Sequence, residues 1–122
     1  MDDKVLGQAG ELAACDYLAC QKQMQILTRN YRSRTGEIDI IARDNDTLVF
    51  IEVKTRRSCR HGQPCEAVSR RKQQKIIHAA MSYLSRHNIW DFPCRFDVIE
   101  VMPSASGQFH IHHIRHAFSL SP

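Results

Sequence analysis

The segment GEIDIIARDNDTLVFIEVK, residues 36–54, indicates the centre of a β-sheet. Its two halves, residues 36–43 and 48–54, are short and rich in isoleucine and valine, and polar residues bound them, as is typical of buried strands. Between them, Asp44-Asn45-Asp46-Thr47 supplies the Asp and Asn residues that tolerate the backbone of a tight turn. The segment therefore predicts an antiparallel hairpin.

Four charged residues interrupt this apolar hairpin: Glu37, Asp39, Glu52 and Lys54. Because strand side chains alternate between the two faces of a sheet, Glu37, Asp39 and Ile41 are expected to share a face. Glu52 and Lys54 are likewise expected to share a face of the second strand. A charge within an apolar strand costs free energy to bury unless it is paired or binds a metal. Folding alone therefore gives a poor reason for these side chains. For Asp39, Glu52 and Lys54 the alternative to a metal site is a structural cluster of salt bridges.

Length and composition indicate one ordinary globular domain. The 122 residues suit a single domain, residues 1–122, of which 43% are hydrophobic and 25% charged. The chain has no apolar run of the ~20 residues that a membrane span needs, and its first four residues contain no apolar signal core. Five cysteines without a C-x-x-C pair fit free thiols in a reducing compartment. We therefore expect a cytoplasmic protein with no membrane partner.

Positive charge is concentrated in residues 54–75, which carry eight basic residues and one acidic residue, whereas the whole chain has a net charge of +4. A locally basic segment in a mildly charged chain predicts a patch that contacts a polyanion. The alternative is a solvated charged face without a ligand. We expect contacts with the phosphates of nucleic acid, DNA in the first place. The residues expected to make them are Arg56, Arg57, Arg60, Arg70, Arg71, Lys72 and Lys75.

The pattern of apolar residues predicts two helices and five strands. The helices are expected at residues 5–21 and from the N-cap Ser69 to about Asn88. The strands are expected at residues 25–31, 36–43, 48–54, 95–101 and 109–114, the last at an edge of the sheet. A strand, a helix and a strand in succession usually form a right-handed parallel crossover. The predicted fold is therefore α/β, with a mixed β-sheet flanked by helices.

The hairpin can bring Asp39 and Glu52 together, because a short turn joins their strands. Two converging carboxylates form a hard oxygen site that suits Mg²⁺ or Mn²⁺. A metal ion lowers the pKa of a bound water and stabilises the charge that develops on a phosphate. Lys54, on the face of Glu52, is expected to orient the attacking water or to neutralise that charge.

Glu11 is the candidate for a third carboxylate. It precedes Ala14 by three residues and Leu18 by seven, and therefore lies on or beside the apolar stripe of the first helix. From there it would bind the metal or hold a metal-bound water. The alternative is a surface carboxylate in the first turns of the helix, where the helix dipole favours negative charge. Periodicity alone leaves both interpretations open.

Five motifs are spread over nearly the whole chain. They are Gly10-Glu11-x-x-Ala14, Arg29-Asn30-Tyr31-Arg32, Gly36-Glu37-Ile38-Asp39, Val49-Phe50-Ile51-Glu52-Val53-Lys54-Thr55-Arg56 and Arg95-Phe96-Asp97-Val98. In combination they resemble the bacterial YraN family, within the PD-(D/E)xK nuclease superfamily of restriction endonucleases and Holliday-junction resolvases.

The resemblance implies a restriction endonuclease-like αβββαβ core. It also implies a catalytic site of Glu11, Asp39, Glu52 and Lys54, in which Asp39, Glu52 and Glu11 hold Mg²⁺ or Mn²⁺. In one respect the chain departs from the superfamily pattern, since Ile38 stands before Asp39 where the superfamily's name has a proline.

Other polar residues are assigned less specific roles. Asp97 is expected to close a structural hydrogen bond outside the site, and Glu37 is either a further ligand or a carboxylate beside a turn. His110 and His112 share a strand face that could hold a transition metal, but an exposed edge strand is the preferred interpretation. The Cys-His-Cys spacing of residues 59–65 matches no zinc motif.

Three functions compete. The first is a divalent-metal-dependent endonuclease that cleaves DNA, branched or single-stranded, in repair or recombination, and that could act as a two-fold homodimer. The second is a nucleic-acid-binding module of nuclease fold that acts with a partner and does not catalyse cleavage. The third is a protein of this fold that acts on RNA or serves as an interaction scaffold. No segment resembles a motif that reads bases, so recognition of structure or ends is expected.

Overall fold

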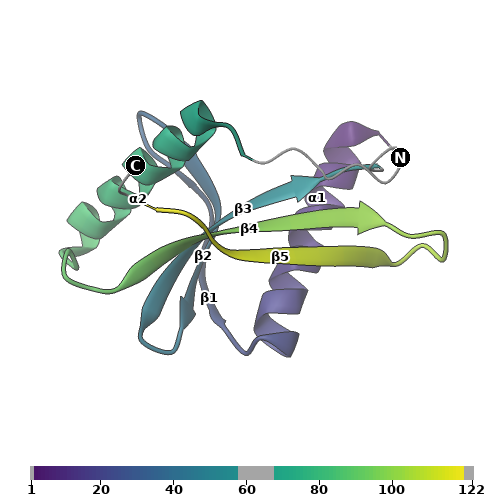
Figure 1. The fold of residues 1–122 in the computed structure, drawn as a ribbon, viewed down its shortest axis with the longest axis horizontal. Helices are drawn as coiled ribbons and strands as arrows, with labels where there is room; N and C mark the ends of the chain where they lie inside the picture. The colour runs from purple at the N-terminus through teal and green to yellow at the C-terminus, as the bar shows by residue number, and fades with distance from the viewer. Residues whose placement is uncertain (1, 58–67, 120–122) are drawn as a thin grey trace.

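The computed structural model describes residues 2–57 and 68–119 of the chain (Figure 1). The elements are α1 (Asp3–Asp16), the π-helical η1 (Tyr17–Gln21), β1 (Gln25–Arg32), β2 (Glu37–Asp44), β3 (Thr47–Thr55), α2 (Arg70–His87), β4 (Cys94–Pro103) and β5 (Phe109–Phe118). Every helix and strand predicted from the sequence is present. β4 and β5 extend beyond their predicted ends because they pair with each other along most of their length.

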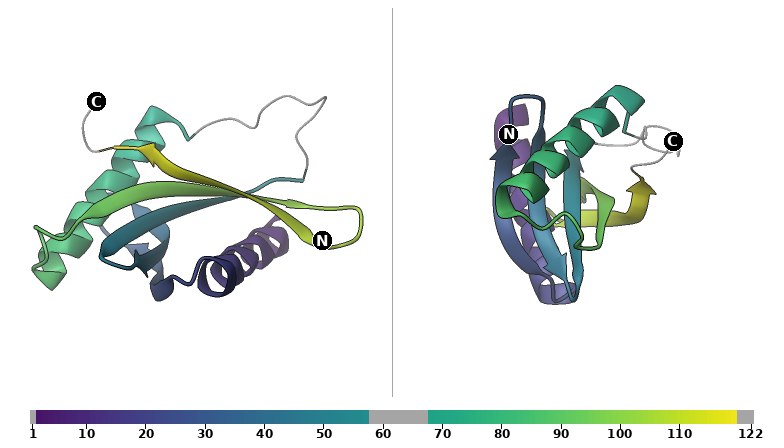
Figure 2. Two further views of the ribbon diagram at one scale, coloured as in Figure 1. Left: turned by 60° about the horizontal axis from the view of Figure 1, so that its bottom comes forward. Right: turned by 90° about the vertical axis from the view of Figure 1, so that its left-hand side faces the viewer.

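The strands form one mixed sheet in the order β1-β2-β3-β4-β5. Neighbouring strands run antiparallel except β3 and β4, which are parallel and joined through α2 (Figure 2). This confirms the predicted α/β fold, a mixed sheet flanked by helices, and it is compatible with an αβββαβ core. β5 lies at one edge of the sheet, as predicted, and β1 lies at the other.

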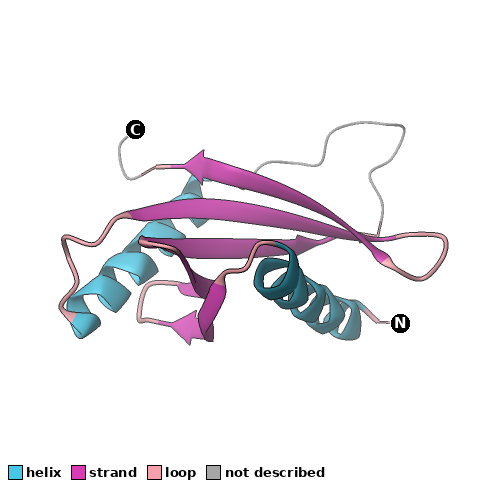
Figure 3. Ribbon diagram, turned by 90° about the horizontal axis from the view of Figure 1, so that it is seen from below, coloured by secondary structure: helices cyan, strands magenta, loops and turns pink. Residues whose placement is uncertain are grey.

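Each helix covers one face of the sheet with its own apolar core (Figure 2). On one face, Ile76 of α2 packs in a cluster with Phe50 of β3. On the other, Ala14 and Leu18 pack in a cluster with Ile51 of β3, and α1 runs beneath the long strands (Figure 3). Fully burying a large apolar side chain stabilises a fold by roughly 1.5–3 kcal/mol. The two cores therefore hold α1 and α2 on opposite faces of the β2–β3 hairpin.

Polar residues set the ends of the elements around this hairpin. Asn45, in the turn between β2 and β3, has a left-handed backbone with φ of 55°, which Asn tolerates. Ser69 is the N-cap of α2, as predicted, and its Oγ accepts a hydrogen bond of 3.1 Å from the N–H of Lys72. Asn88 ends α2 with φ of 55°. Ser69 and Asn88 thereby set the two ends of α2.

No helix in the described ranges is long and apolar enough to cross a membrane. Within those ranges Cys15, Cys20 and Cys94 are free thiols. The motif of residues 59–65 lies outside the described residues.

Candidate active site

β2 and β3 stop pairing at the level of the predicted carboxylates. The ladder between them ends at the Ile40–Ile51 pair. Beyond it, Oδ2 of Asp39 accepts a hydrogen bond of 2.8 Å from the backbone N–H of Val53. A side-chain carboxylate thus takes the place of a backbone acceptor. The two strands separate where Asp39 and Glu52 stand, and this opening is the candidate site.

The expected alternation of β2 side chains breaks at Asp39. Ile38 belongs to the core under α2, whereas Ile40, two residues further on, belongs to the core under α1. On the adjacent strand, Asn30 lies between the residues that pair with Ile38 and Ile40, and its backbone is left-handed with φ of 54°. The prediction of strict alternation over residues 37–41 is therefore wrong. β1 and β2 are locally irregular at Asn30 and Asp39, and at this point the carboxylate of Asp39 reaches the backbone of β3.

Glu52 is a buried carboxylate with a strongly raised pKa. Its side chain is 9% exposed, and its Oε2 lies 3.6 Å from Nζ of Lys72 on α2. Burial raises the pKa of Glu52 to about 8, with a further contribution from the charge and hydrogen bond of Asp39. The charges of Lys72 and Lys54 offset part of this rise. In the absence of a bound cation, Glu52 therefore holds a proton at neutral pH.

Glu11 approaches the same site from α1. Its Oε1 is buried and has no hydrogen-bond partner within the described part of the chain. Burial raises the pKa of Glu11, the negative charge of Asp39 raises it further, and Arg29 opposes both. Gly10 allows this approach, because a Cβ at that position would overlap Oγ1 of Thr55 at the end of β3. The structure thus places Glu11 beside Asp39 on the inward side of α1.

Lys54 and Glu37 occupy different parts of the site. Lys54 is half-buried, and its charge lowers the pKa of Glu52, so it stands within electrostatic reach of the carboxylates. Glu37 is exposed, and its Oε2 lies 3.5 Å from Nε of Arg32 on β1. Exposed ion pairs of this kind contribute about 0–1 kcal/mol. Glu37 therefore stands at the rim of the site.

The donor set fits a small, hard divalent cation. In residues 2–57 and 68–119 no three His, Cys, Asp or Glu side chains are spaced to hold a metal by themselves. Mg²⁺ needs no such cage, since one or two carboxylates with waters and substrate phosphates commonly hold it. Asp39 and Glu52 supply two carboxylates, and the unpartnered Oε1 of Glu11 is a further acceptor. A cation would also offset the burial and the repulsion from Asp39 that raise the pKa of Glu52.

Two of the predicted phosphate contacts follow β3 and are paired within the chain. Nε of Arg56 lies 3.7 Å from Oε2 of Glu100 on β4, and the Arg56 side chain is 28% exposed. Nη2 of Arg57 lies 2.8 Å from Oδ1 of Asp3, and both side chains are largely exposed. Because an exposed pair is weak, Arg57 can exchange Asp3 for a phosphate more easily than Arg56 can leave Glu100.

The predicted contacts on α2 are more accessible. Arg70, Arg71 and Lys75 are exposed in its first turns, and within the described ranges they form no ion pair. Lys72 is paired with Glu52, as described above. Arg60 lies outside the described residues.

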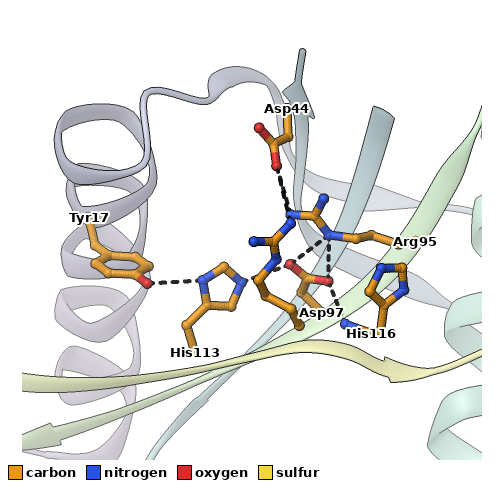
Figure 4. A network of polar contacts seen from close by, with 7 residues as sticks. Tyr17, Asp44, Arg95, Asp97, His113 and His116 are labelled. Atoms are coloured by element: carbon orange, nitrogen blue, oxygen red, sulfur yellow. Dashed lines mark hydrogen bonds and ion pairs between the residues drawn. The ribbon is translucent and has the colours of Figure 1, made fainter. Parts of the chain in front are cut away.

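A second polar network lies at the opposite end of β2 and has a structural role (Figure 4). Asp97 is fully buried, with Nε of Arg95 3.1 Å from Oδ1 and Nε2 of His113 2.7 Å from Oδ2. Nδ1 of His113 lies 3.0 Å from the hydroxyl of Tyr17, and Nη2 of Arg95 lies 3.0 Å from Asp44. Burial would raise the pKa of Asp97, but the hydrogen bonds from His113 and Arg95 outweigh it and lower the pKa. These contacts are those of a structural residue outside the site.

The C-terminal histidines form no metal cluster in the described part of the chain. Nδ1 of His112 lies 3.1 Å from Oε1 of Glu100, and the His112 side chain is 70% exposed. His113 belongs to the Asp97 network. The preferred interpretation, an exposed edge strand, agrees with the positions of His110 and His112 on β5.

Two cavities border the site. One of about 360 Å³ lies between the β1–β2 turn and α2, where Arg34 and Lys75 line it. The other, of about 630 Å³, is lined by Glu11 of α1 and Arg29 of β1, and Arg32 lines both cavities. Sequence reasoning assigned no role to these three arginines. The signal in the sequence is the presence of three arginines within residues 29–34.

Proteins similar to this chain match it over most of its length. The model of "Uncharacterised protein family UPF0102" matches residues 10–101. A UPF0102 protein of Symbiobacterium thermophilum is 47% identical over 113 residues, which cover 93% of this chain and 95% of the relative. A UPF0102 protein of Clostridioides difficile is 45% identical over 118 residues, 97% of this chain and 100% of the relative. One of Chlorobium limicola is 48% identical over 122 aligned residues, 96% of this chain and 94% of the relative.

Proposed function

The chain belongs to the uncharacterised protein family UPF0102, and from its carboxylates we propose that it is a divalent-metal-dependent endonuclease that cleaves phosphodiester bonds of DNA. The observation that carries the proposal is the buried Glu52 beside Asp39, with its pKa raised to about 8. A fold gains nothing from holding two carboxylates together in a poorly solvated place. A site that binds a cation does benefit from two neighbouring carboxylates, because the cation compensates both negative charges.

Each residue of the site has a role in this proposal. Asp39 and Glu52 would hold Mg²⁺ or Mn²⁺ through their oxygens, and Glu11, whose Oε1 has no hydrogen-bond partner within the described residues, would hold a water at the same place. The bound cation supplies activation of a water and neutralisation of phosphate charge. Lys54 places its ammonium near the carboxylates, where it binds a phosphate oxygen and stabilises the negative charge that develops on it.

The resemblance to the PD-(D/E)xK superfamily supports the same reaction. Its residues Asp39, Glu52 and Lys54 come from the two strands β2 and β3 and stand at the point where those strands separate. The mixed sheet is compatible with the superfamily core. The printed names of the UPF0102 relatives state no activity, so the reaction is inferred from the site and the resemblance.

The proposed substrate is branched or single-stranded DNA. Arg70, Arg71 and Lys75 on α2 offer charge for phosphates, a contact that does not depend on base sequence. No helix of the described chain carries a recognised base-reading motif. Recognition of a shape or of a strand end is therefore proposed.

A nucleic-acid-binding module without catalysis is the second candidate function. The specific observation in its favour is Nζ of Lys72 at 3.6 Å from Oε2 of Glu52. An ammonium in this position offsets part of the cost of ionising Glu52 without a metal. In this alternative the chain binds nucleic acid, and a partner protein performs the reaction.

Cleavage of labelled DNA separates the two functions. Branched, nicked and single-stranded DNA are incubated with Mg²⁺ or Mn²⁺ and with the wild type, Asp39→Asn or Glu52→Gln. Asp46→Asn, in the exposed β2–β3 turn, is the matched control. Cleavage by the wild type and the control, and its loss in the two site variants, supports the nuclease. A salt-sensitive gel shift in all four proteins with no cleavage supports the binding module.

A competition experiment separates DNA from RNA. Unlabelled RNA of the same sequence is added to a labelled DNA complex of the wild type. Displacement at equal concentration rejects DNA as the preferred ligand. The sizes of the labelled products, measured where cleavage occurs, give the position of the cut.

A further inference from the structure

The 360 Å³ cavity between the β1–β2 turn and α2 has no role in the site described above. Residues 32–37 form one wall, and Lys72 and Lys75 of α2 form the other. The four basic residues of the lining face one acidic residue, Glu37. A cavity with this excess of positive charge suits an anion.

The pairing of the lining residues leaves two cations for a ligand. Arg32 lies 3.5 Å from Glu37, and Lys72 lies 3.6 Å from Glu52. Within residues 2–57 and 68–119, Arg34 and Lys75 form no ion pair. A guanidinium and an ammonium from two different elements therefore meet at one cavity.

The wall formed by the turn is fixed before any ligand arrives. The N–H of Ser33 donates a hydrogen bond of 2.8 Å to the carbonyl of Gly36, and its Oγ donates one of 3.1 Å to the same oxygen. Gly36 lies directly against α2, because a Cβ there would overlap the carbonyl oxygen of Lys75. Only glycine allows the turn to come this close. The backbone of this wall is thus ordered by folding and not by binding.

The position of the cavity indicates which anion it takes. Lys72 lines the cavity and also contacts Glu52, so the cavity adjoins the carboxylates. On the other side of Arg32 the 630 Å³ cavity continues along Arg29 to Glu11. The two cavities and the carboxylates therefore follow one another around the open edge strand β1. The phosphates of a nucleic-acid strand are also arranged in a row, so such a strand is the anion that fits these neighbouring sites.

We propose that Arg34 and Lys75 form a subsite for a backbone phosphate of a single nucleic-acid strand, which runs from this cavity past the carboxylates to the cavity at Arg29. The role of this subsite in catalysis rests on the proposed nuclease function. Its role in binding a nucleic-acid strand does not depend on that function.

The test measures binding of a fluorescent single-stranded DNA oligonucleotide by polarisation in EDTA, so that cleavage plays no part. The double variant Arg34→Gln/Lys75→Gln is compared with the wild type and with Lys22→Gln/Arg86→Gln, which removes two exposed positive charges elsewhere. Each phosphate contact to a single strand contributes about 0.7 to the slope of log K against log salt. We expect the cavity variant to bind about tenfold more weakly, with a lower salt slope, whereas the control stays close to the wild type.

The outcomes are distinct. Wild-type affinity and salt slope in the cavity variant, with its thermal unfolding unchanged, would overturn the subsite. If inorganic phosphate stabilises the wild type against thermal unfolding and fails to stabilise the cavity variant, while both bind the oligonucleotide equally, the cavity is a free-phosphate site and the strand assignment is rejected. A third outcome separates the two proposals. If the wild type cuts no DNA and the cavity variant binds the oligonucleotide more weakly than the wild type, the nuclease is rejected and the subsite is supported.

Discussion

Replacing Glu52 by glutamine is expected to stabilise the metal-free protein at alkaline pH, although it changes a residue of the proposed site. In the unfolded chain the carboxyl loses its proton near pH 4.5, whereas in the folded chain burial and Asp39 hold the proton until about pH 8. Between these two values the unfolded state has released a proton that the folded state keeps. The free energy of unfolding of the wild type therefore falls as the pH rises through this window and levels off above it.

The size of the effect follows from the shift. At about 1.4 kcal/mol for each pKa unit, the rise from 4.5 to about 8 makes the folded protein with ionised Glu52 on the order of 5 kcal/mol less stable. Glutamine has nearly the same shape, carries no charge and can donate a hydrogen bond to Asp39. Glu52→Gln and the wild type should therefore be equally stable near pH 5, and the variant should be more stable by several kcal/mol at pH 9.

Urea unfolding followed by circular dichroism at pH 5, 7 and 9, with EDTA present, measures this difference. Asp46→Asn, an exposed carboxylate in the β2–β3 turn, is the control and should follow the wild type at each pH. A stability difference between Glu52→Gln and the wild type that is the same at pH 5 and pH 9 would refute the reasoning. It would mean that Glu52 is ionised in the folded protein throughout this range.

Three further predictions concern the cation, α1 and the Asp97 network. At pH 8, Mg²⁺ at 100 times its dissociation constant should stabilise the wild type by about 2.7 kcal/mol, measured by urea unfolding, and should stabilise Asp39→Asn much less. Gly10→Ala should destabilise the protein, because its methyl group would overlap Thr55, and should reduce cleavage per folded molecule by displacing α1. Asp97→Asn should cost about 1–3 kcal/mol of stability, because it removes one of the two carboxylates that pair with buried Arg95 and leaves Asp44 as the other, and cleavage per folded molecule should stay unchanged.

Matched controls make these predictions specific. Gly7, also in α1, has nothing within 4 Å of an added Cβ. Gly7→Ala should therefore stabilise the protein by about 0.5–1 kcal/mol through helix propensity, and a similar gain from Gly10→Ala would contradict the close approach to β3. Equal stabilisation of the wild type and Asp39→Asn by Mg²⁺ would place the cation elsewhere. Loss of cleavage by folded Asp97→Asn would make the network part of the site.

The elements and their order follow from local patterns. Runs of Ile and Val predicted β2 and β3, Ser69 marked the start of α2, and the strand, helix and strand succession predicted the parallel pair. These features depend on neighbouring residues and on the general handedness of the chain. The expectation that a hairpin brings Asp39 and Glu52 together depends on the same local geometry.

What the patterns did not predict depends on contacts between distant segments. The break in alternation at Asp39 involves the left-handed Asn30 on another strand and a bond to the backbone of β3. The pairing of Arg56 with Glu100 joins β3 to β4, so charge counting could not show that this arginine is engaged. Arg34 and Lys75 line one cavity, at which Gly36 lies against α2. The nuclease activity, the cation and the contacts of Arg60 stay predictions.

The parallel pairing of β3 with β4 also bears on how the molecule folds. β1, β2 and β3 are joined by short turns, so their pairing closes small loops, whereas β4 reaches β3 only after the chain has passed through α2. Closing the larger loop costs more chain entropy and slows the formation of such contacts. We expect pulsed hydrogen exchange during refolding to protect the β1–β3 amides before those of β4, and the reverse order would contradict this. Glu52 would then acquire its buried surroundings among the last events of folding.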